Sequence, residues 1–146
     1  MRVFVLDDHD VVRRRLKELL EADGDVEVVG EAGTAEEARS SIPMSRPDVA
    51  VLDVRLSDGN GVEVCREIRS RHPEIQCVML SAFDDDEIVA QSILAGASGY
   101  VLKQIKHGNI VNAVRLVASG ESLFEPSLRA RVLERLDDGP GDEGGA

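Results

Sequence analysis

Short apolar runs alternate along the chain with longer segments in which apolar residues recur every three or four positions. The runs lie at about residues 2–7, 26–30, 49–54, 76–81 and 99–102. Runs of this length and composition are typical of strands that are buried on both faces, as in parallel sheets. The intervening segments have the spacing of amphipathic helices. The pattern therefore predicts five strands that alternate with helices.

This alternation predicts an α/β fold. Strands and helices joined by short connections favour right-handed crossovers and a parallel sheet with helices on both faces. Five strands fit the doubly wound, flavodoxin-like order 2-1-3-4-5. The second helix is expected to begin after Thr34, with Glu37 completing a capping box. It is expected to end at Ile42, before Pro43. We expect this domain to span residues 1–120.

The pattern changes after residue 120. The segment 121–136 is expected to hold a sixth helix at 126–136, whose apolar residues recur every four positions at Leu128, Val132 and Leu136. A helix this short is not stable alone. We therefore expect this stripe, with Leu123 and Phe124, to take part in a homodimer or to dock where a missing output domain would sit. The alternative is packing on the fifth helix of its own domain. Residues 137–146 are acidic, rich in Gly and poor in apolar residues, which predicts a disordered linker.

The composition narrows the possible functions. The 146 residues suit one domain with a full-sized core, and 17 basic against 28 acidic residues give a formal net charge of −11. An acidic domain lacks the excess of basic residues that nucleic-acid binding requires, so any DNA contact would need residues outside this chain. No apolar run approaches the roughly 20 residues of a membrane helix, and no signal peptide is visible. We expect a cytoplasmic protein without a membrane partner.

Several reactive or charged residues are interpreted as structural. Cys65 and Cys77 lack the spacing of metal ligands and are expected to be reduced and buried. His9 is expected to be a surface residue at the start of a helix. The three consecutive arginines at 13–15 are expected to form a solvated helix face, given the net charge. Residues 57–61 are expected to form a turn, because they lack the pattern of a phosphate loop.

Residues with phosphate or metal chemistry follow four of the predicted strands. They are Asp7 and Asp8 after the first, Asp53 after the third, Ser81 after the fourth and Lys103 after the fifth. Because parallel strands end at the same edge of a sheet, where open α/β sheets bind ligands, these side chains should converge. Three clustered carboxylates repel one another unless a cation is bound, and Mg²⁺ prefers oxygen ligands.

Together these groups can serve one reaction. A carboxylate beside Mg²⁺ can attack a phosphoryl group and form an acyl phosphate. The charge on the transferring oxygens would be neutralised by the metal and by Lys103, and Ser81 would donate a hydrogen bond. The sequence therefore predicts Mg²⁺-dependent phosphoryl transfer to a carboxylate at this edge of the sheet.

Three segments resemble a known family. They are GEAGTAEEA, RPDVAVLDVRLSDGNGVEVCREI and ILAGASGYVLK. With the strand-end residues, they make residues 2–118 resemble the receiver domain of bacterial two-component response regulators. The resemblance is strongest to the NarL/FixJ subfamily and, within it, to the actinobacterial dormancy (hypoxia-response) regulators. It implies the flavodoxin-like receiver fold, phosphorylation by a sensor histidine kinase, and Mg²⁺ as the cofactor.

The resemblance also implies a role for each site residue. Asp53 would be the phosphoacceptor. The ligands of Mg²⁺ would be Asp7, Asp8, Asp53 and the backbone carbonyl of Arg55. The phosphoryl group would be bound by Ser81, Ala82 and Lys103. The switch pair would be Ser81 and Tyr100.

Two positions depart from the family pattern without removing a chemical group. Gln104 follows Lys103 where the family often has Pro, so a cis bond is not expected there and the loop is expected to be more mobile. Ser57 replaces a Pro that is frequent in the loop after the phosphoacceptor.

The implied function is that of a phosphorylation-controlled switch, not of an enzyme beyond its own phosphotransfer and dephosphorylation. Its output would be a DNA-binding domain outside this chain that regulates transcription, and the acidic, Gly-rich end favours a missing helix-turn-helix domain. A stand-alone receiver that acts through protein contacts is the alternative. A haloacid-dehalogenase-type phosphatase is disfavoured because Arg55 replaces its second Asp. A flavin protein is disfavoured because Asp7 and Asp8 would repel phosphate without metal.

Overall fold

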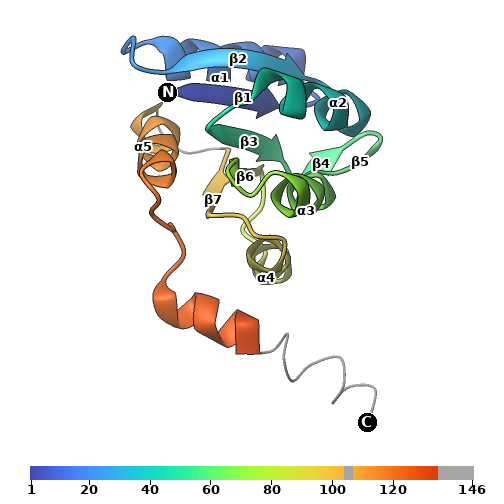
Figure 1. Ribbon diagram of the computed structural model, residues 1–146, viewed down its shortest axis with the longest axis vertical. Helices are drawn as coiled ribbons and strands as arrows, with labels where there is room; N and C mark the ends of the chain where they lie inside the picture. Colours follow the sequence, from blue (N-terminus) through green and yellow to red (C-terminus); the bar gives the residue numbers. More distant parts are fainter. Residues whose placement is uncertain (104–106, 135–146) are drawn as a thin grey trace.

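A five-stranded parallel sheet forms the centre of the computed structural model, which describes residues 1–103 and 107–134 (Figure 1). The strands are β1 (Arg2–Leu6), β2 (Glu27–Ala32), β3 (Val49–Asp53), β6 (Gln76–Ser81) and β7 (Gly99–Leu102). Their order is β2-β1-β3-β6-β7, and every neighbouring pair is parallel. Counted along the chain this is 2-1-3-4-5, so the predicted fold class is confirmed. Gln104 and the predicted linker 137–146 lie outside the described residues.

Five helices pack on the two faces of this sheet. They are α1 (Asp10–Glu21), α2 (Ala35–Ser45), α3 (Gly61–Arg71), α4 (Asp86–Leu94) and α5 (His107–Ala118). Val3 and Val5 of β1 enter a buried cluster with α1 and α5. Phe4 and Leu6 enter a second cluster with α2, α3 and α4. Both faces of the strands are therefore buried, which explains their continuous apolar runs. None of the described helices is long and apolar enough to cross a membrane.

The end of α2 differs from the prediction. The helix continues through Pro43 to Ser45 and does not stop at Ile42. Proline removes only one hydrogen bond when less than a turn of helix follows it. The last turn then closes at Arg46, whose left-handed backbone lets its N–H donate to the Ile42 carbonyl at 3.2 Å.

Three side chains accept hydrogen bonds from the backbone at the start of α2. The Thr34 hydroxyl accepts a hydrogen bond from the Glu37 N–H at 3.1 Å, and the Glu37 carboxylate accepts one from the Gly33 N–H at 3.0 Å. The first bond is the one expected of a capping box, but Glu37 accepts its bond from Gly33, one residue before the Thr34 cap, and not from the Thr34 N–H. The Asp58 carboxylate, from a neighbouring hairpin, accepts hydrogen bonds from the first two N–H groups of the helix at 2.8 and 3.1 Å. The hairpin is thereby tied to α2.

That hairpin stands where the sequence predicted only a turn at 57–61. In it, β4 (Arg55–Leu56) pairs antiparallel with β5 (Gly59–Asn60). The predicted turn is present at residues 57 and 58, but strands of two residues are too short to produce a periodic pattern, so the pairing that flanks the turn was not predicted. The chain then returns to the end of β3, where a Cβ at Gly61 would lie 1.9 Å from the Asp53 carbonyl oxygen. Only glycine permits this approach, which fixes the backbone behind Asp53.

The chain after α5 forms the sixth helix, which spans residues 126–134 within the described part. Phe124 and Val132 are buried in the same apolar cluster as α4, together with the partly buried Ile88 and Tyr100. Figure 1 shows this helix beside α4. Packing within the chain, the alternative among the expected outcomes, is therefore found. It occurs on the α4 side and not, as expected, on α5.

Candidate functional site

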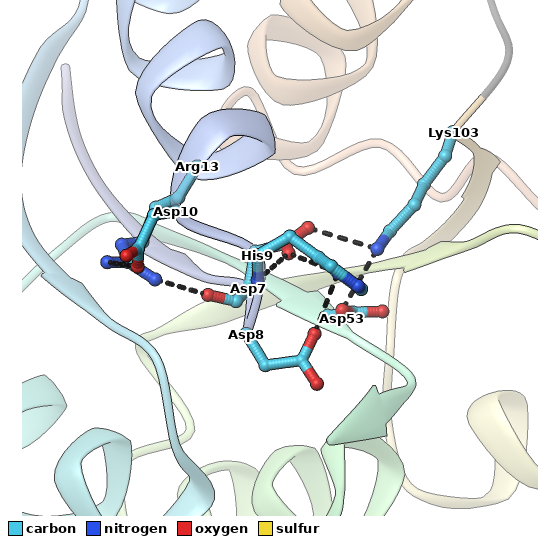
Figure 2. A network of polar contacts seen from close by, with 7 residues as sticks. All are labelled: Asp7, Asp8, His9, Asp10, Arg13, Asp53 and Lys103. Atoms are coloured by element: carbon cyan, nitrogen blue, oxygen red, sulfur yellow. Dashed lines mark hydrogen bonds and ion pairs between the residues drawn. The ribbon is translucent and has the colours of Figure 1, made fainter. Parts of the chain in front are cut away.

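The strand ends bring the predicted carboxylates and the lysine together at one edge of the sheet (Figure 2). Asp7 and Asp8 follow β1, and Asp53 ends the neighbouring strand β3. Lys103 follows β7, which is separated from β3 by β6. Its long side chain spans that distance, because Lys103 Nζ lies 3.0 Å from Asp53 Oδ2 and 3.1 Å from Asp7 Oδ2. The convergence predicted from parallel strand ends is therefore present.

The acidic residues form a compact group of potential metal ligands. One ligand atom from each of Asp7, Asp8, His9 and Asp53 lies within 4.8 Å of the others. Asp7 and Asp53 are buried, with 0% and 3% exposure. The His9 side chain is 67% exposed, so the expected surface position is right, but its Nδ1 lies 2.9 Å from Asp8 Oδ1. The sequence analysis did not include His9 in the group.

Two carboxylate oxygens in this group accept no hydrogen bond within the described part of the chain. They are Asp7 Oδ2 and Asp8 Oδ1, both buried. Lys103 Nζ lies 3.1 Å from Asp7 Oδ2, and His9 Nδ1 lies 2.9 Å from Asp8 Oδ1, but these contacts are ion pairs that lack hydrogen-bond geometry. A buried oxygen without a hydrogen bond is costly, and an oxygen-preferring divalent cation would satisfy it. The donor set therefore fits Mg²⁺.

Burial and charge shift the pKa values of the two residues at the centre of the site. Burial raises the pKa of the Asp53 carboxyl to about 6, and the neighbouring charges of Asp7 and Asp8 act in the same direction. The hydrogen bond from Lys103 opposes this shift without cancelling it. Burial acts to lower the pKa of Lys103, but the hydrogen bond and charge of Asp53, together with the ion pair to Asp7, outweigh it and raise that pKa. Lys103 is thus charged, and Asp53 is largely ionised at neutral pH.

The two predicted switch hydroxyls meet at Phe83, a residue that the sequence analysis missed. The buried Ser81 hydroxyl donates to the Phe83 carbonyl and accepts from the Phe83 N–H, both at 3.1 Å. The Tyr100 hydroxyl donates to the same carbonyl at 2.5 Å. Ala82 is exposed and links Ser81 to Phe83. In the described residues, neither hydroxyl is hydrogen-bonded to Asp53.

Arg55 connects the metal-ligand side of the site to Phe83. Its guanidinium carbon lies 4.8 Å from the centre of the Phe83 ring, which is a cation–π distance. Ser57, from the same hairpin, lines an open polar pocket of about 580 Å³ beside Asp8. The expected role of the Arg55 backbone carbonyl as a ligand stays a prediction.

Other residues interpreted from the sequence as structural have mixed outcomes. Cys65 and Cys77 are free and buried, as expected. Arg14 and Arg15 are exposed, but the Arg13 side chain is only 17% exposed and binds three acceptors. The prediction of a solvated face is therefore wrong for Arg13, because a run of like residues does not reveal which member faces the protein.

Comparison with known sequences shows the family. Residues 3–115 match the response regulator receiver domain. The chain belongs to this family. Over 136 residues the receiver is 50% identical to the DNA-binding transcriptional activator DevR/DosR of Mycobacterium tuberculosis, which covers 93% of this chain and 63% of that protein. It is 34% identical to the response regulator protein VraR of Staphylococcus aureus, with 93% and 65% covered. The chain thus spans less than two thirds of the length of these curated relatives.

Solved structures agree with this assignment. The signal receiver domain of the response regulator NarL from Mycobacterium tuberculosis has 38% identity and a TM-score of 0.79, with 82% of this chain and 97% of that chain covered. A LuxR-family two-component response regulator from Aurantimonas sp. has 28% identity and a TM-score of 0.81, with 92% and 96% covered. The predicted membership among NarL-type receivers is confirmed. The roles of individual site residues stay predictions.

Proposed function

We propose that this receiver domain accepts a phosphoryl group on Asp53 from a sensor histidine kinase. The observation that carries the proposal is the position of Lys103, which joins the Asp53 and Asp7 carboxylates beside buried oxygens that accept no hydrogen bond. Asp7, Asp8, Asp53 and the backbone carbonyl of Arg55 would hold Mg²⁺. When bound, Mg²⁺ would neutralise charge on the phosphoryl oxygens.

The residues of the chain supply the rest of the transfer. An oxygen of the ionised Asp53 attacks phosphorus, and the bond from phosphorus to the donor's imidazole nitrogen breaks as the new bond forms. The Lys103 ammonium, already 3.0 Å from Asp53 Oδ2, neutralises the negative charge on the transferring group. The Ser81 hydroxyl and the main chain at Ala82 bind the other phosphoryl oxygens.

We propose that the same group then acts as a switch. To bind a phosphoryl oxygen, the Ser81 hydroxyl must leave the Phe83 carbonyl that it shares with Tyr100. Tyr100 is then released to reorient, and the surface of α4, β7 and α5 shifts between two pre-existing states. The domain acts as a phosphorylation-controlled switch rather than as an enzyme with a separate substrate.

We further propose that the output is control of transcription through a DNA-binding domain outside these residues, with the receiver boundary near residue 120. The 50% identical relative is named a DNA-binding transcriptional activator, and this chain covers 63% of it. A stand-alone receiver is the alternative, and the reading frame beyond residue 146 would distinguish the two.

We also propose that the phosphorylated form is a homodimer. Sedimentation with and without a beryllium fluoride mimic tests this. The cytoplasmic location stays a prediction.

Phosphorylation of Asp53 is tested directly by intact mass. Acetyl phosphate with Mg²⁺ should add one phosphoryl group to the wild-type chain, and Asp53→Asn should abolish the gain because the amide is not a nucleophile. Asp84→Asn, an exposed aspartate at the start of α4, is the matched control and should behave as wild type. A phosphoryl group that persists on Asp53→Asn would move the acceptor elsewhere and overturn the proposal.

A further inference from the structure

Arg13 of α1 makes three hydrogen bonds to three different parts of the chain. Its Nη1 donates to the Asp7 carbonyl at 2.6 Å, its Nη2 to Asp10 Oδ1 at 2.7 Å, and its Nε to Glu31 Oε1 of β2 at 3.0 Å. The side chain is only 17% exposed. Figure 2 shows the guanidinium beside the backbone of Asp7, on the side away from Lys103.

These bonds act on the turn that carries the acidic pair. Asp7 supplies one of the two buried oxygens that accept no hydrogen bond, and its backbone carbonyl is held by Arg13. The same turn is fixed by the His9 N–H, which donates to Asp7 Oδ1 at 2.8 Å. The guanidinium fork is planar and rigid, so it can fix the direction of a carbonyl that a single point charge would leave free.

The backbone at Gly33 leaves room for this guanidinium. A Cβ added there would lie 3.1 Å from Arg13 Nη1 and 3.9 Å from the Asp7 carbonyl oxygen. The first distance is tighter than an ordinary contact, so a methyl group would displace the Arg13 tip by a few tenths of an ångström. Gly33 therefore offers a way to disturb the position of Arg13 without changing a charge.

We propose that Arg13 is a positioning residue for the Mg²⁺ site: it holds the turn after β1 so that Asp7 and Asp8 face the same point as Asp53. This rests on the proposed function, in which those carboxylates bind Mg²⁺. Arg13 does not itself touch the ligand. It acts through the Asp7 backbone, much as outer partners orient the ligands of other metal sites.

The direction of the change in Mg²⁺ affinity when Arg13 is replaced distinguishes a positioning role from a purely electrostatic one. A positive guanidinium near the cluster repels a divalent cation, so its removal should tighten Mg²⁺ binding if charge alone mattered. Loss of position should weaken binding. Arg13→Gln should therefore lower Mg²⁺ affinity by about tenfold, the lower end of the loss seen when an outer partner of a metal ligand is removed. Arg13→Lys should also weaken binding, because an ammonium cannot make the three-way fork.

The experiment is a calorimetric Mg²⁺ titration of the whole chain, below the melting temperature of every variant. Arg14→Gln removes the same charge from the exposed face of α1 and should bind as wild type. Val117→Ala, in the fully buried core of α5, should lower stability without changing Mg²⁺ affinity, which separates positioning from a loss of stability. Gly33→Ala should weaken binding in the same direction as Arg13→Gln, but less.

Each outcome has a distinct meaning. Mg²⁺ affinity in Arg13→Gln equal to or tighter than wild type would overturn the positioning role, and so would full affinity in Arg13→Lys. A wild-type chain that binds no Mg²⁺ would remove the proposed metal site itself. If the proposed metal site is absent, the wild-type chain itself binds no Mg²⁺. If only the role of Arg13 is wrong, the wild-type chain still binds Mg²⁺ and the Arg13 variants bind it equally well.

Discussion

The site at the edge of the sheet has an acidic half, formed by Asp7, Asp8 and Asp53, and a hydroxyl half, formed by Ser81 and Tyr100. The two halves differ in how far their polar atoms are hydrogen-bonded. In the acidic half, Asp7 Oδ2 and Asp8 Oδ1 are buried and accept no hydrogen bond from the residues that the structure describes. In the hydroxyl half, Ser81 and Tyr100 both donate to the Phe83 carbonyl. The first half is therefore prepared for a ligand, whereas the second is closed by contacts within the chain.

The two halves are nevertheless neighbours. Asp53 of β3 pairs with Leu80, the residue before Ser81 in β6. The Arg55 guanidinium, two residues after Asp53, stacks on the Phe83 ring. A movement of the main chain after Asp53 can therefore reach the carbonyl that holds both hydroxyls.

Removing the charge of Asp53 should have the largest effect. Because the folded-state pKa of about 6 exceeds the usual 3.8, the folded protein holds this proton more tightly than the unfolded chain. The resulting stability is present below pH 3.8 and is lost as pH rises through 6. At pH 7.5 without metal, Asp53→Asn should therefore be more stable than wild type by up to roughly 3 kcal/mol.

Urea unfolding in a chelator at pH 7.5 and pH 5 measures this difference. The advantage of Asp53→Asn should shrink to about half at pH 5, since the folded wild type is then mostly protonated at Asp53. Asp84→Asn should show no comparable gain at either pH. An Asp53→Asn variant that is no more stable than wild type at pH 7.5 would show that the acidic half is not strained.

Loss of one metal ligand should have the next largest effect. Mg²⁺ should raise the melting temperature of wild type by binding the folded state preferentially. Asp8→Ala should weaken Mg²⁺ affinity by on the order of tenfold, about 1.4 kcal/mol, because Mg²⁺ takes few carboxylates from a protein. Without metal, the variant should be as stable as wild type or more so, since it lacks one repelling charge.

Thermal unfolding across a Mg²⁺ series tests this expectation. Asp84→Ala is a suitable control, because Asp84 is exposed and is not among the clustered ligand atoms. Equal Mg²⁺ responses in wild type and Asp8→Ala would argue against the acidic half as the metal site.

Loss of the Tyr100 hydrogen bond in the hydroxyl half should have the smallest effect on stability. Tyr100→Phe removes one hydrogen bond to the Phe83 carbonyl, which typically stabilises by about 0.5–1.5 kcal/mol. The free protein should then resemble the form bound to beryllium fluoride more closely. Amide exchange over α4 and β7 should increase in the free variant and change less when the mimic binds.

Phe83→Leu is the matched control, since it keeps the carbonyl and both hydrogen bonds while removing the ring that Arg55 stacks on. Its exchange over α4 and β7 should stay closer to wild type than that of Tyr100→Phe. If the mimic changes exchange only in the loop after Asp53, a relay through Tyr100 is ruled out.

The acidic half was predictable from the sequence, and the hydroxyl half only in part. The residue types of Asp7, Asp53 and Lys103 indicate metal and phosphate chemistry, and the parallel strands determine where their side chains meet. Phe83 acts through its main-chain carbonyl, which every residue possesses, so no side-chain signal marks it. The sequence could name the hydroxyls of Ser81 and Tyr100 but not the acceptor that holds them.

Long elements were likewise more predictable than local ones. The parallel sheet followed from the alternation of strands and helices, and its order from the doubly wound arrangement that five strands fit, whereas the two-residue strands β4 and β5 have no period to detect. The continuation of α2 through Pro43 depended on how little helix follows the proline. The four-residue spacing of apolar residues around Val132 indicated that one face of the last helix is buried, but not that this face packs on the α4 side.

The last helix has a consequence for the energetics of signalling. Val132 and Phe124 are buried in the cluster that contains Tyr100 and Ile88, so docking of the helix and the state of the switch depend on one surface. Two equilibria that share a surface are thermodynamically linked, and the linkage is reciprocal. If phosphorylation loosens the helix by some factor, anything that pulls the helix away must favour phosphorylation by that same factor. A partner that captured residues 126–134 would therefore sensitise the domain to its phosphoryl donor without approaching Asp53.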